Sequence, residues 1–474
     1  ILFYHLGIGK KTLIMKNYNR RNFLKKSTLG AVAASTLSIS CQENMSKSSP
    51  GKYMGDFAAK PYDNVKAAFI GLGARGPGHL KNFSTLENTQ VVGLCDLYED
   101  NVKRESTRLK DYNKNSSNVK LYWGSENNWK TMLKETNPDI VFICTNWKNH
   151  APMVIQTMLD GAHAFCEVPL ALTTLEMWDI VNTSEHTQKH CMMMENVNYG
   201  RDELMYLNMC RKGVVGDLLH AEAAYIHELR FQMNQEERGT GSWRTNHYAE
   251  GKGNLYPTHG LGPVAQYMNI AREEDNFKTI VSYSTPALGR KSYANKNFDK
   301  DHKWNKLNYN NGDLNTSIIK TNMGRTILVQ WDETSPRPYT RHNLIQGSKG
   351  TLAGFPTRVA LEGGFEGISE DHHSWIQGKD LNLLYEKYDH PLYKRLNSKT
   401  KKSGHGGMDG IMMYRIVECL QKGLPLDQNV YEGCFWSAVT PLSGKSIDEN
   451  GMPQEFPDFT RGKWKQTNPL NIIT

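Results

Sequence analysis

The sequence predicts an α/β protein in two parts: a doubly wound parallel sheet, followed by an α+β domain with an open, mostly antiparallel sheet. Short apolar runs alternate with amphipathic runs over residues 64–198, a pattern typical of the strands and helices of a parallel sheet. A complete G-x-G-x-x-G turn follows the first of these apolar runs. Over residues 199–474 several segments alternate with a period of two, which favours half-buried antiparallel strands.

The glycine-rich turn begins the predicted parallel sheet. Residues 67–70 read as a buried strand that runs directly into Gly71-Leu72-Gly73-Ala74-Arg75-Gly76. In such a turn Gly71 permits the tight bend, Gly73 lets a pyrophosphate approach the backbone, and Gly76 lets helix and strand pack closely. The following helix presents its N-terminal N–H groups to the phosphates. A glycine triplet alone is equally compatible with an ordinary loop, but strand, turn and helix in this order indicate a dinucleotide-binding Rossmann domain.

A single acidic residue predicts which dinucleotide binds. Asp96 ends the second apolar run, residues 91–95, and stands twenty residues after Gly76. Its carboxylate can accept hydrogen bonds from both ribose hydroxyls and would repel a 2′-phosphate. The sequence therefore predicts NAD rather than NADP as the cofactor.

The rest of the first half continues the same alternation. Further strands are predicted at residues 139–145, 162–167 and 190–196, with helices at 151–159 and 174–188 between them. Ligands of parallel sheets bind at the carboxyl ends of the strands. The polar residues at or just past those ends are therefore expected to line the site, and they are Asn146, Trp147, His150, Glu167 and Asn196.

The second half is predicted to contain the antiparallel sheet. The expected strands are Leu218–Glu228, Ser317–Met323, Thr326–Asp332, His342–Gln346 and Thr351–Phe355. Between the first two lies a long segment, residues 230–275, dense in Trp, Arg, Asn, His and Tyr. Segments of that length without strands are usually functional. Helical spacing at residues 407–422, followed by residues 431–442, predicts C-terminal helices that can pack back on the first domain.

The first 41 residues are expected to stand outside the folded domains. Residues 1–14 look like upstream sequence, and Met15 begins a segment in which the pair Arg20-Arg21 precedes a short apolar run at 29–39. This pattern resembles a Tat-type signal peptide, which implies export to the periplasm. The apolar run is too short to span a bilayer. Cys41 leaves two interpretations open: a lipid anchor at the cell envelope, or an incidental cysteine next to another cleavage site.

Composition limits the remaining possibilities. Residues 42–63, rich in Ser, Lys, Gly and Pro, read as a linker, and the rest of the 474-residue chain is long enough for two domains with their own cores. The net charge of +8 comes partly from the signal and from the Lys-rich stretch 394–402. No basic stripe with interleaved aromatic residues is present, which argues against nucleic acid as a partner. The eight cysteines show no metal-ligand spacing and no disulfide framework, so no metal site is predicted.

Beyond these patterns, the chain resembles the Gfo/Idh/MocA family. The glycine-rich start, the strand end Glu167-Val168-Pro169-Leu170-Ala171, and the open sheet after the nucleotide domain carry this resemblance. Five further motifs resemble glycoside hydrolase family 109, whose members are NAD-dependent α-N-acetylgalactosaminidases. These motifs are Trp147-Lys148-Asn149-His150, Glu195-Asn196-Val197-Asn198-Tyr199, Trp243-Arg244-Thr245-Asn246-His247-Tyr248, Leu255-Tyr256-Pro257-Thr258-His259-Gly260 and Gly404-His405-Gly406-Gly407-Met408-Asp409. The resemblance runs from about Lys66 to the C-terminus.

One departure from the wider family separates its branches. Sugar dehydrogenases of that family usually carry Glu-Lys-Pro at this strand end, where the lysine assists proton transfer. Here the position is Val168, which cannot move a proton, and this favours the hydrolase branch. A periplasmic NAD-dependent sugar oxidoreductase of the Gfo/Idh/MocA family stays open as the alternative, and so does a sugar-binding protein that keeps the nucleotide only as structure.

The resemblance also implies which residues form the site. It places Ala74 and Arg75 at the pyrophosphate and Asp96 at the ribose. The residues implied for the nicotinamide side are Trp147, Lys148, Asn149, His150, Glu167, Val168 and Asn196. The residues implied for the substrate are Tyr225, Arg244, Tyr256, Pro257, Thr258, His259 and Tyr339. Tyr256 is assigned to both cofactor and substrate.

The expected chemistry differs from that of ordinary glycosidases, which use two carboxylates. The resemblance implies that NAD⁺ oxidises C3 of the sugar, that loss of the C2 proton expels the anomeric substituent, and that water addition and re-reduction complete the turnover. We expect His259 to take the C3 hydroxyl proton, Tyr225 to be the C2 base, and Tyr256 to orient substrate or handle water addition. The division of these roles among the three stays open. The expected partners are a carbohydrate with terminal α-linked N-acetylgalactosamine and, through the open sheet, further copies of the chain.

Overall fold

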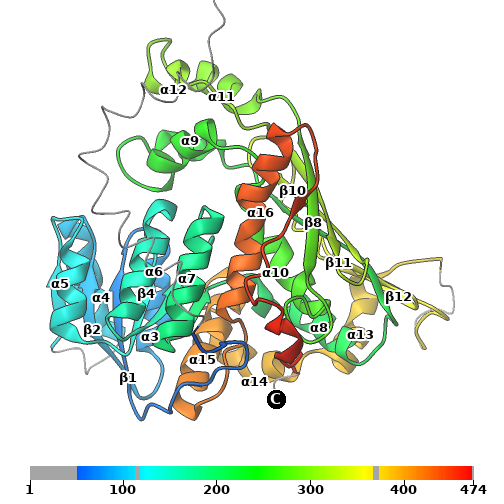
Figure 1. Ribbon diagram of the computed structural model, residues 1–474, viewed down its shortest axis with the longest axis horizontal. Helices are drawn as coiled ribbons and strands as arrows, with labels where there is room; N and C mark the ends of the chain where they lie inside the picture. The colour runs from blue at the N-terminus through cyan, green and yellow to red at the C-terminus, as the bar shows by residue number, and fades with distance from the viewer. Residues whose placement is uncertain (1–50, 113–117, 367–372, 472–474) are drawn as a thin grey trace, which may run out of the picture. The chain divides into compact units, whose positions relative to one another are not determined.

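The computed structural model describes residues 51–112, 118–366 and 373–471 (Figure 1). The predicted signal peptide, Cys41 and the first part of the predicted linker lie outside these residues. Within the described ranges, the helices lack the combination of length and apolar character that crossing a membrane requires. In the same ranges, no group of three or more His, Cys, Asp or Glu side chains is arranged to hold a metal ion.

The first half of the described chain forms a parallel sheet with the order β3-β2-β1-β4-β5-β6. The strands are β1 (Val65–Ile70), β2 (Thr89–Cys95), β3 (Lys120–Tyr122), β4 (Ile140–Ile143), β5 (His163–Cys166) and β6 (Cys191–Met193). Neighbouring strands pair in parallel throughout. The chain reverses its direction across the sheet at β1, between β2 and β4, which is where such sheets bind nucleotides. The predicted Rossmann fold is confirmed.

Helices cover this sheet. They are α3 (Gly76–Ser84), α4 (Glu99–Tyr112), α5 (Asn128–Thr136), α6 (His150–Leu159) and α7 (Thr174–Thr187). The last two follow their predicted bounds closely, and α7 begins with a capping box formed by Thr173 and Glu176. Helix α4 was not predicted, because it is highly charged and carries only two buried apolar residues, Val102 and Leu109.

The second half forms a larger sheet with the order β14-β13-β12-β11-β7-β10-β9-β8-β15. Its strands are β7 (Leu218–Ile226), β8 (Phe277–Ser284), β9 (Asn315–Thr321), β10 (Thr326–Asp332), β11 (Leu344–Gly347), β12 (Gly350–Ala353), β13 (Arg358–Leu361), β14 (Ile376–Gln377) and β15 (Gln454–Glu455). The pair β7 and β10 runs parallel, and the other neighbouring strands pair antiparallel. The predicted mostly antiparallel sheet is confirmed. Strand β8 was not predicted. Its pairing register with β9 shifts near its start, and this shift interrupts the alternation of buried and exposed residues.

The long segment 230–275, in which no strand was expected, contains helices. These are η3 (Arg230–Asn234), α9 (Thr240–Glu250) and α10 (Thr258–Tyr267). Helix α10 contains Gly260, Gly262 and Pro263, residues that disfavour helices when judged alone. Its tertiary position explains the first of them: a Cβ on Gly260 would lie 2.3 Å from the backbone nitrogen of Ala224 in β7. Helix α10 therefore lies directly on β7, in a position that only glycine permits.

Helices near the C-terminus connect the two sheets. The remaining helices of the second half are η2 (Asn196–Tyr199), α8 (Arg201–Arg211), α11 (Gly289–Asn297), α12 (Lys303–Lys306), η4 (Gly378–Asp380), α13 (Leu381–Tyr388), α14 (Pro391–Thr400), η5 (His405–Gly407), α15 (Met408–Lys422), α16 (Val430–Asp448) and η6 (Lys463–Gln466). The long helix α16 contacts β8 on one side and α7 and β6 on the other, and α15 packs on α3 and β1 (Figure 1). The second half of the chain therefore contacts the nucleotide-binding half directly.

The described part of the predicted linker is packed rather than loose. Met54 is buried, and the ring of Tyr53 stacks on Tyr431 with the ring centroids 4.9 Å apart. The backbone N–H of Tyr62 donates a hydrogen bond to the carbonyl of Leu420, 3.1 Å away. These contacts attach residues 51–63 to α15 and α16.

Candidate active site

The glycine turn after β1 has the shape of a dinucleotide cradle. Gly71 has a φ of +89°, and a Cβ there would lie 2.5 Å from the carbonyl oxygen of Cys144. A Cβ on Gly76 would lie 1.9 Å from the carbonyl oxygen of Gly71. At Gly73, by contrast, the described residues leave the space within 4 Å of a Cβ open. Packing within the protein thus requires glycine at 71 and 76, while the open space at 73 fits the approach of a pyrophosphate.

Asp96 lies beside this turn at the end of β2. One carboxylate oxygen, Oδ2, accepts the backbone N–H of Leu72 at 2.6 Å, and Oδ1 accepts that of Tyr98 at 2.9 Å. Both bonds fix the carboxylate against the glycine turn, and each oxygen keeps a further acceptor site. Asp96 therefore has the geometry to receive ribose hydroxyls, as predicted for NAD.

One cleft of about 1030 Å³ contains residues of both predicted groups. From the cofactor group it is lined by Gly71, Gly73, Ala74, Arg75, Asp96, Trp147, Asn149, His150, Glu167, Val168 and Asn196, and from the substrate group by Tyr225, Arg244, Tyr256 and His259. The nucleotide cradle and the Tyr–His–Arg cluster therefore share a single cavity. A cofactor and a sugar can be in contact there.

Five predicted residues do not line this cleft in the described part of the chain. They are Gly76, Lys148, Pro257, Thr258 and Tyr339. Lys148 is exposed, while Thr258 is buried in the first turn of α10. The Tyr339 ring lies beside the cluster, with its centroid 6.1 Å from that of Tyr225.

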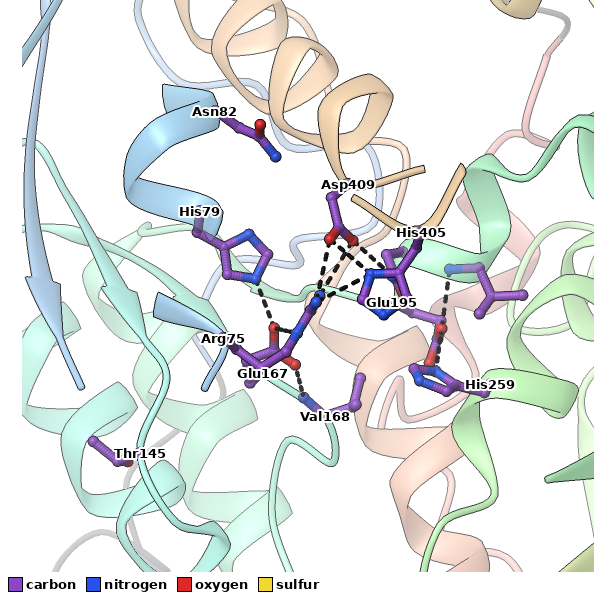
Figure 2. Close-up of polar contacts among 12 residues, drawn as sticks. Arg75, His79, Asn82, Thr145, Glu167, Val168, Glu195, His259, His405 and Asp409 are labelled. Carbon is purple, nitrogen blue, oxygen red and sulfur yellow. Dashed lines mark hydrogen bonds and ion pairs between the residues drawn. The ribbon is translucent and has the colours of Figure 1, made fainter. Parts of the chain in front are cut away.

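An ionic network joins the glycine turn to α15 (Figure 2). The Arg75 guanidinium contacts Glu167 Oε1 through Nε at 2.9 Å and Asp409 through Nη1 and Nη2, each at 3.2 Å. Asp409 also accepts hydrogen bonds from Asn196 Nδ2 at 2.7 Å and from His405 Nδ1 at 2.8 Å. The Arg75 side chain therefore has two carboxylate partners, and both Ala74 and Arg75 line the cleft.

The two carboxylates of this network are held in the ionised form. Burial alone would raise the pKa of Glu167, but the charge of Arg75 and the hydrogen bond from His79 outweigh it, and the pKa lies well below its usual range. The pKa of Asp409 is likewise lowered, because its hydrogen bond from His405 and the charge of Arg75 outweigh its burial. His79 Nε2 lies 2.6 Å from Glu167 Oε1. The network is therefore a set of charged groups, of which Arg75 and Glu167 line the cleft.

Arg244 lies among aromatic rings on the substrate side. Its guanidinium carbon is 4.7 Å from the ring centroid of Trp147 and 5.3 Å from that of Tyr256. Burial would lower the pKa of Arg244, but nearby groups, Tyr248 and Glu333 foremost, raise it above its usual value. Its buried Nε has no hydrogen-bond partner among the described residues. Arg244 thus keeps its charge, and one of its buried donors lacks a partner in the described chain.

Tyr225, Tyr256 and His259, the three predicted catalytic residues, form one cluster. The Tyr225 ring centroid lies 4.6 Å from that of Tyr256 and 5.3 Å from that of His259. Burial raises the pKa of Tyr225 well above its usual range, although Arg244 acts in the opposite direction. The positive charge of Arg244 would lower the pKa of Tyr225, but the effect of burial is larger. Tyr225 is therefore a neutral phenol in this structure, with its hydroxyl 3.0 Å from His227 Nδ1.

His259 and His150 have different surroundings. His259 Nδ1 lies 2.7 Å from Glu195 Oε1, and its Nε2 lies 3.4 Å from the Tyr256 hydroxyl. His150 contacts two backbone carbonyls, those of Pro169 at 2.7 Å and Thr145 at 3.1 Å. Burial lowers the pKa of His150. Its ring therefore holds the loops after β4 and β5 in place.

Six residues of the site were given no role from the sequence, although four of them stand in the quoted motifs. They are His79, Glu195, His227, Trp243, His405 and Asp409. His227 follows Tyr225 by two residues, and the period of two in a strand could have revealed it. The acids could not be found in this way, because Glu195 is 64 residues from its partner His259 and Asp409 is 334 residues from Arg75.

Comparison with known proteins gives consistent matches. Residues 199–466 match the glycosyl hydrolase 109 C-terminal domain, and residues 65–195 match the NAD-binding Rossmann fold of the GFO_IDH_MocA oxidoreductase family. Glycosyl hydrolase family 109 protein 1 of Akkermansia muciniphila is 59% identical over 423 residues, covering 89% of this chain and 87% of the relative. The glycosyl hydrolase family 109 protein of Shewanella baltica is 49% identical over 464 residues, covering 97% of this chain and 100% of the relative.

Two solved structures share the fold at low identity. An NAD binding oxidoreductase from Klebsiella pneumoniae aligns with a TM-score of 0.65 at 14% identity, covering 83% of this chain and 99% of that chain. A levoglucosan dehydrogenase, solved with NADH and levoglucosan, aligns with a TM-score of 0.61 at 14% identity, covering 83% of this chain and 100% of that chain. At this identity the likeness shows the fold, in agreement with the two sheets described above.

Proposed function

This chain belongs to glycosyl hydrolase family 109 and carries an NAD-binding Rossmann domain, and from this premise we propose that it hydrolyses terminal α-N-acetylgalactosaminides with an NAD that is recycled in every turnover. The observation that carries the proposal is the shared cleft, where the glycine cradle and the cluster of Tyr225, Tyr256 and His259 meet. The strand end at Val168 also supports it, because a buried valine offers no proton transfer of the kind a sugar dehydrogenase needs. When bound, NAD supplies a reversible oxidation at C3 of the sugar, which acidifies the C2 hydrogen.

His259 is the proposed proton acceptor at the C3 hydroxyl. Its Nε2 is on the side of Tyr256, whose hydroxyl is 3.4 Å away, and the residue lines the cleft. A histidine is suited to this task because small changes in its surroundings suffice to protonate or deprotonate it near neutral pH. Tyr256, buried between Tyr225 and Trp147, would orient the sugar against the cofactor side.

Tyr225 and His227 together are the proposed base at C2. Burial lowers the pKa of His227, which favours its neutral form, and in the tautomer with the proton on Nε2 its Nδ1 would accept the Tyr225 hydroxyl proton across 3.0 Å. As that proton moves to His227, the Tyr225 oxygen can take the proton from C2. This arrangement explains how a tyrosine with a raised pKa can act as a base without first becoming a free phenolate.

Arg244 is the proposed contact for the C2 acetamido group. Its Nε is buried and lacks a hydrogen-bond partner in the described chain, and an unsatisfied buried donor is costly. An amide carbonyl of the substrate would satisfy it. The surrounding rings of Trp147, Trp243 and Tyr256 would exclude water from this contact.

The test is release of p-nitrophenol from the α-N-acetylgalactosaminide by the purified holoenzyme, with no added nucleotide. We expect many turnovers per enzyme and no accumulation of absorbance from reduced nicotinamide. The α-galactoside, which lacks the acetamido group, and the β-anomer serve as matched controls and should react far more slowly. Net formation of NADH from free N-acetylgalactosamine, without glycoside cleavage, would instead identify a sugar oxidoreductase of the wider family.

We propose in addition that the protein is exported in folded form, as the Arg20-Arg21 pair indicates, to the periplasm or the envelope surface. A protein that binds its nucleotide in the cytoplasm needs a pathway for folded cargo. Replacing both arginines by lysine should leave the protein in the cytoplasmic fraction. Cys41→Ser should release it from membranes if a lipid anchor holds it there, and unchanged membrane association would exclude that anchor.

We propose that copies of the chain associate through the outward face of the second sheet. Tyr283 and Ile318 on this face are 62% and 52% exposed, and they lie on the neighbouring strands β8 and β9. Exposed apolar groups on adjacent strands are typical of interaction surfaces. Light scattering should show an oligomer that Ile318→Glu dissociates, and a wild-type monomer would contradict the proposal.

A further inference from the structure

Glu195 is a carboxylate buried behind the cleft. Its side chain has an exposed fraction of 0%, and it stands between β6 and η2, where Oε1 accepts the backbone N–H of Val197 at 3.2 Å. Helix α10 packs tightly against it, since a Cβ on Gly262 would lie 2.9 Å from Glu195 Cγ. The carboxylate is therefore held in one position.

Glu195 Oε1 determines which ring nitrogen of His259 carries a proton. Oε1 already accepts from a backbone N–H, so it is an acceptor, and His259 Nδ1 at 2.7 Å must donate to it (Figure 2). In a neutral imidazole with the proton on Nδ1, Nε2 is an acceptor. Nε2 is the nitrogen on the side of Tyr256 and the cleft.

The position of His259 in its helix makes such a partner necessary. It is the second residue of α10, where the positive end of the helix dipole favours a negatively charged neighbour. The other carboxylate oxygen, Oε2, is buried and has no hydrogen-bond partner in the described ranges. The negative charge of Glu195 is therefore directed mainly at the His259 ring and the Val197 N–H.

We propose that Glu195 is the positioning residue for His259, fixing the Nδ1–H tautomer so that Nε2 alone faces the substrate. The proposal rests on the proposed function. With NAD⁺ bound, the C3–H bond would break and its hydride would pass to the cofactor, while the O3–H bond breaks and its proton binds Nε2, which gives an imidazolium with protons on both nitrogens. The Glu195 carboxylate stabilises that charge, and on re-reduction of C3 the same proton returns to O3.

Two substitutions of Glu195 distinguish its effect on the His259 tautomer from the effect of its negative charge. Glu195→Gln keeps a carbonyl oxygen that can accept from Val197 and from His259 Nδ1, but removes the negative charge. Glu195→Ala removes both. We expect kcat to fall by about 100-fold in Glu195→Gln, within the range for one acid–base group, and further in Glu195→Ala. KM and the amount of bound NAD should stay within about threefold, because neither depends on proton transfer.

A second measurement needs no substrate. In histidine labelled with ¹⁵N, the NMR shifts of the ring nitrogens report which one is protonated, and the His259→Gln variant identifies the His259 signals. We expect the Nδ1–H tautomer in the wild type and in Glu195→Gln, and a mixture with Nε2–H in Glu195→Ala. A His259 that keeps the Nδ1–H tautomer in Glu195→Ala would overturn the proposal, and so would a kcat for that variant within threefold of wild type.

The control is another buried carboxylate with a close partner. Glu185 has a side-chain exposed fraction of 2% and contacts Arg461 at 2.9 Å, but Arg461, unlike His259, does not line the cleft. Glu185→Gln should leave kcat and the His259 tautomer unchanged. If the wild type cleaves no α-N-acetylgalactosaminide, the proposed function fails, and the spectrum alone still decides whether Glu195 sets the tautomer.

Discussion

Replacing Asp409 by asparagine should weaken the attachment of the glycine turn to α15. Asp409 contacts Arg75 in this turn, although the two residues are 334 positions apart in the chain. The carboxylate accepts four contacts, two from Arg75 and one each from Asn196 and His405. An amide offers one acceptor oxygen, and its NH₂ group would face donors. At least two of the four contacts are therefore lost, and Arg75 keeps only Glu167 as a charged partner.

The expected effect follows from burial. The Asp409 side chain is 5% exposed and that of Arg75 is 31% exposed. Breaking a fully buried ion pair costs about 3–5 kcal/mol, and the partial exposure of Arg75 reduces this to about 2–4 kcal/mol. Because Arg75 is part of the glycine turn, we also expect NAD affinity to fall about tenfold. That loss corresponds to about 1.4 kcal/mol less stabilisation by saturating NAD.

Urea unfolding of Asp409→Asn with and without NAD measures both quantities. The control is Asp389→Asn, since Asp389 also holds an arginine at 2.7 Å, and this arginine, Arg201, does not line the cleft as Arg75 does. The Asp389→Asn variant should have a lower free energy of unfolding than wild type, and NAD should stabilise it as much as it stabilises wild type. The reasoning is refuted if Asp409→Asn unfolds within about 1 kcal/mol of wild type and gains the same stabilisation from NAD.

Three further predictions concern other parts of the molecule. Gly73→Ala should fold normally, because described atoms leave its Cβ open space, and should lose most NAD binding in calorimetry. Gly76→Ala should be destabilised even without NAD, because its Cβ would meet a carbonyl oxygen 1.9 Å away. Equal stability of the two apoproteins would contradict this. Tyr225→Phe removes the hydroxyl next to His227 and should lower kcat by about 100-fold with full NAD content, so near-normal turnover would exclude it as the base. Burial lowers the pKa of His190 to about 3, so below about pH 6.5 the unfolded chain binds a proton that the folded chain does not. Unfolding free energy should therefore fall by about 2 kcal/mol between about pH 6.5 and pH 5 from this group, and a His190→Gln variant with an unchanged pH dependence would contradict the assignment.

The parallel half of the fold could be predicted in detail because its signals are local. The turn from Gly71 to Gly76 and the acid at Asp96 have fixed spacing, and the structure explains each glycine by a contact or an open space. The short strand β3 and the charged helix α4 could not be predicted in this way. Both carry few buried apolar residues, and packing against neighbours decides their structure.

The substrate side was predicted mainly from motifs, and its supporting residues depend on tertiary contacts. Helix α10 brings His259 to Tyr225 only because Gly260 lies against the backbone of β7, and its glycines and proline hide it from helix propensity. Glu195 and Asp409 stand in the quoted motifs, but their roles become visible only when their distant partners are known. Charge pairing between remote segments leaves no periodic signal in a sequence.

The most direct test of the central claim is the mass of the released sugar after hydrolysis in D₂O. If a temporary ketone at C3 acidifies C2, the N-acetylgalactosamine formed without added nucleotide should contain one non-exchangeable deuterium at C2. Unreacted glycoside and a sample of the free sugar incubated with denatured enzyme set the background. Release of N-acetylgalactosamine that carries only hydrogen at C2 would contradict the account.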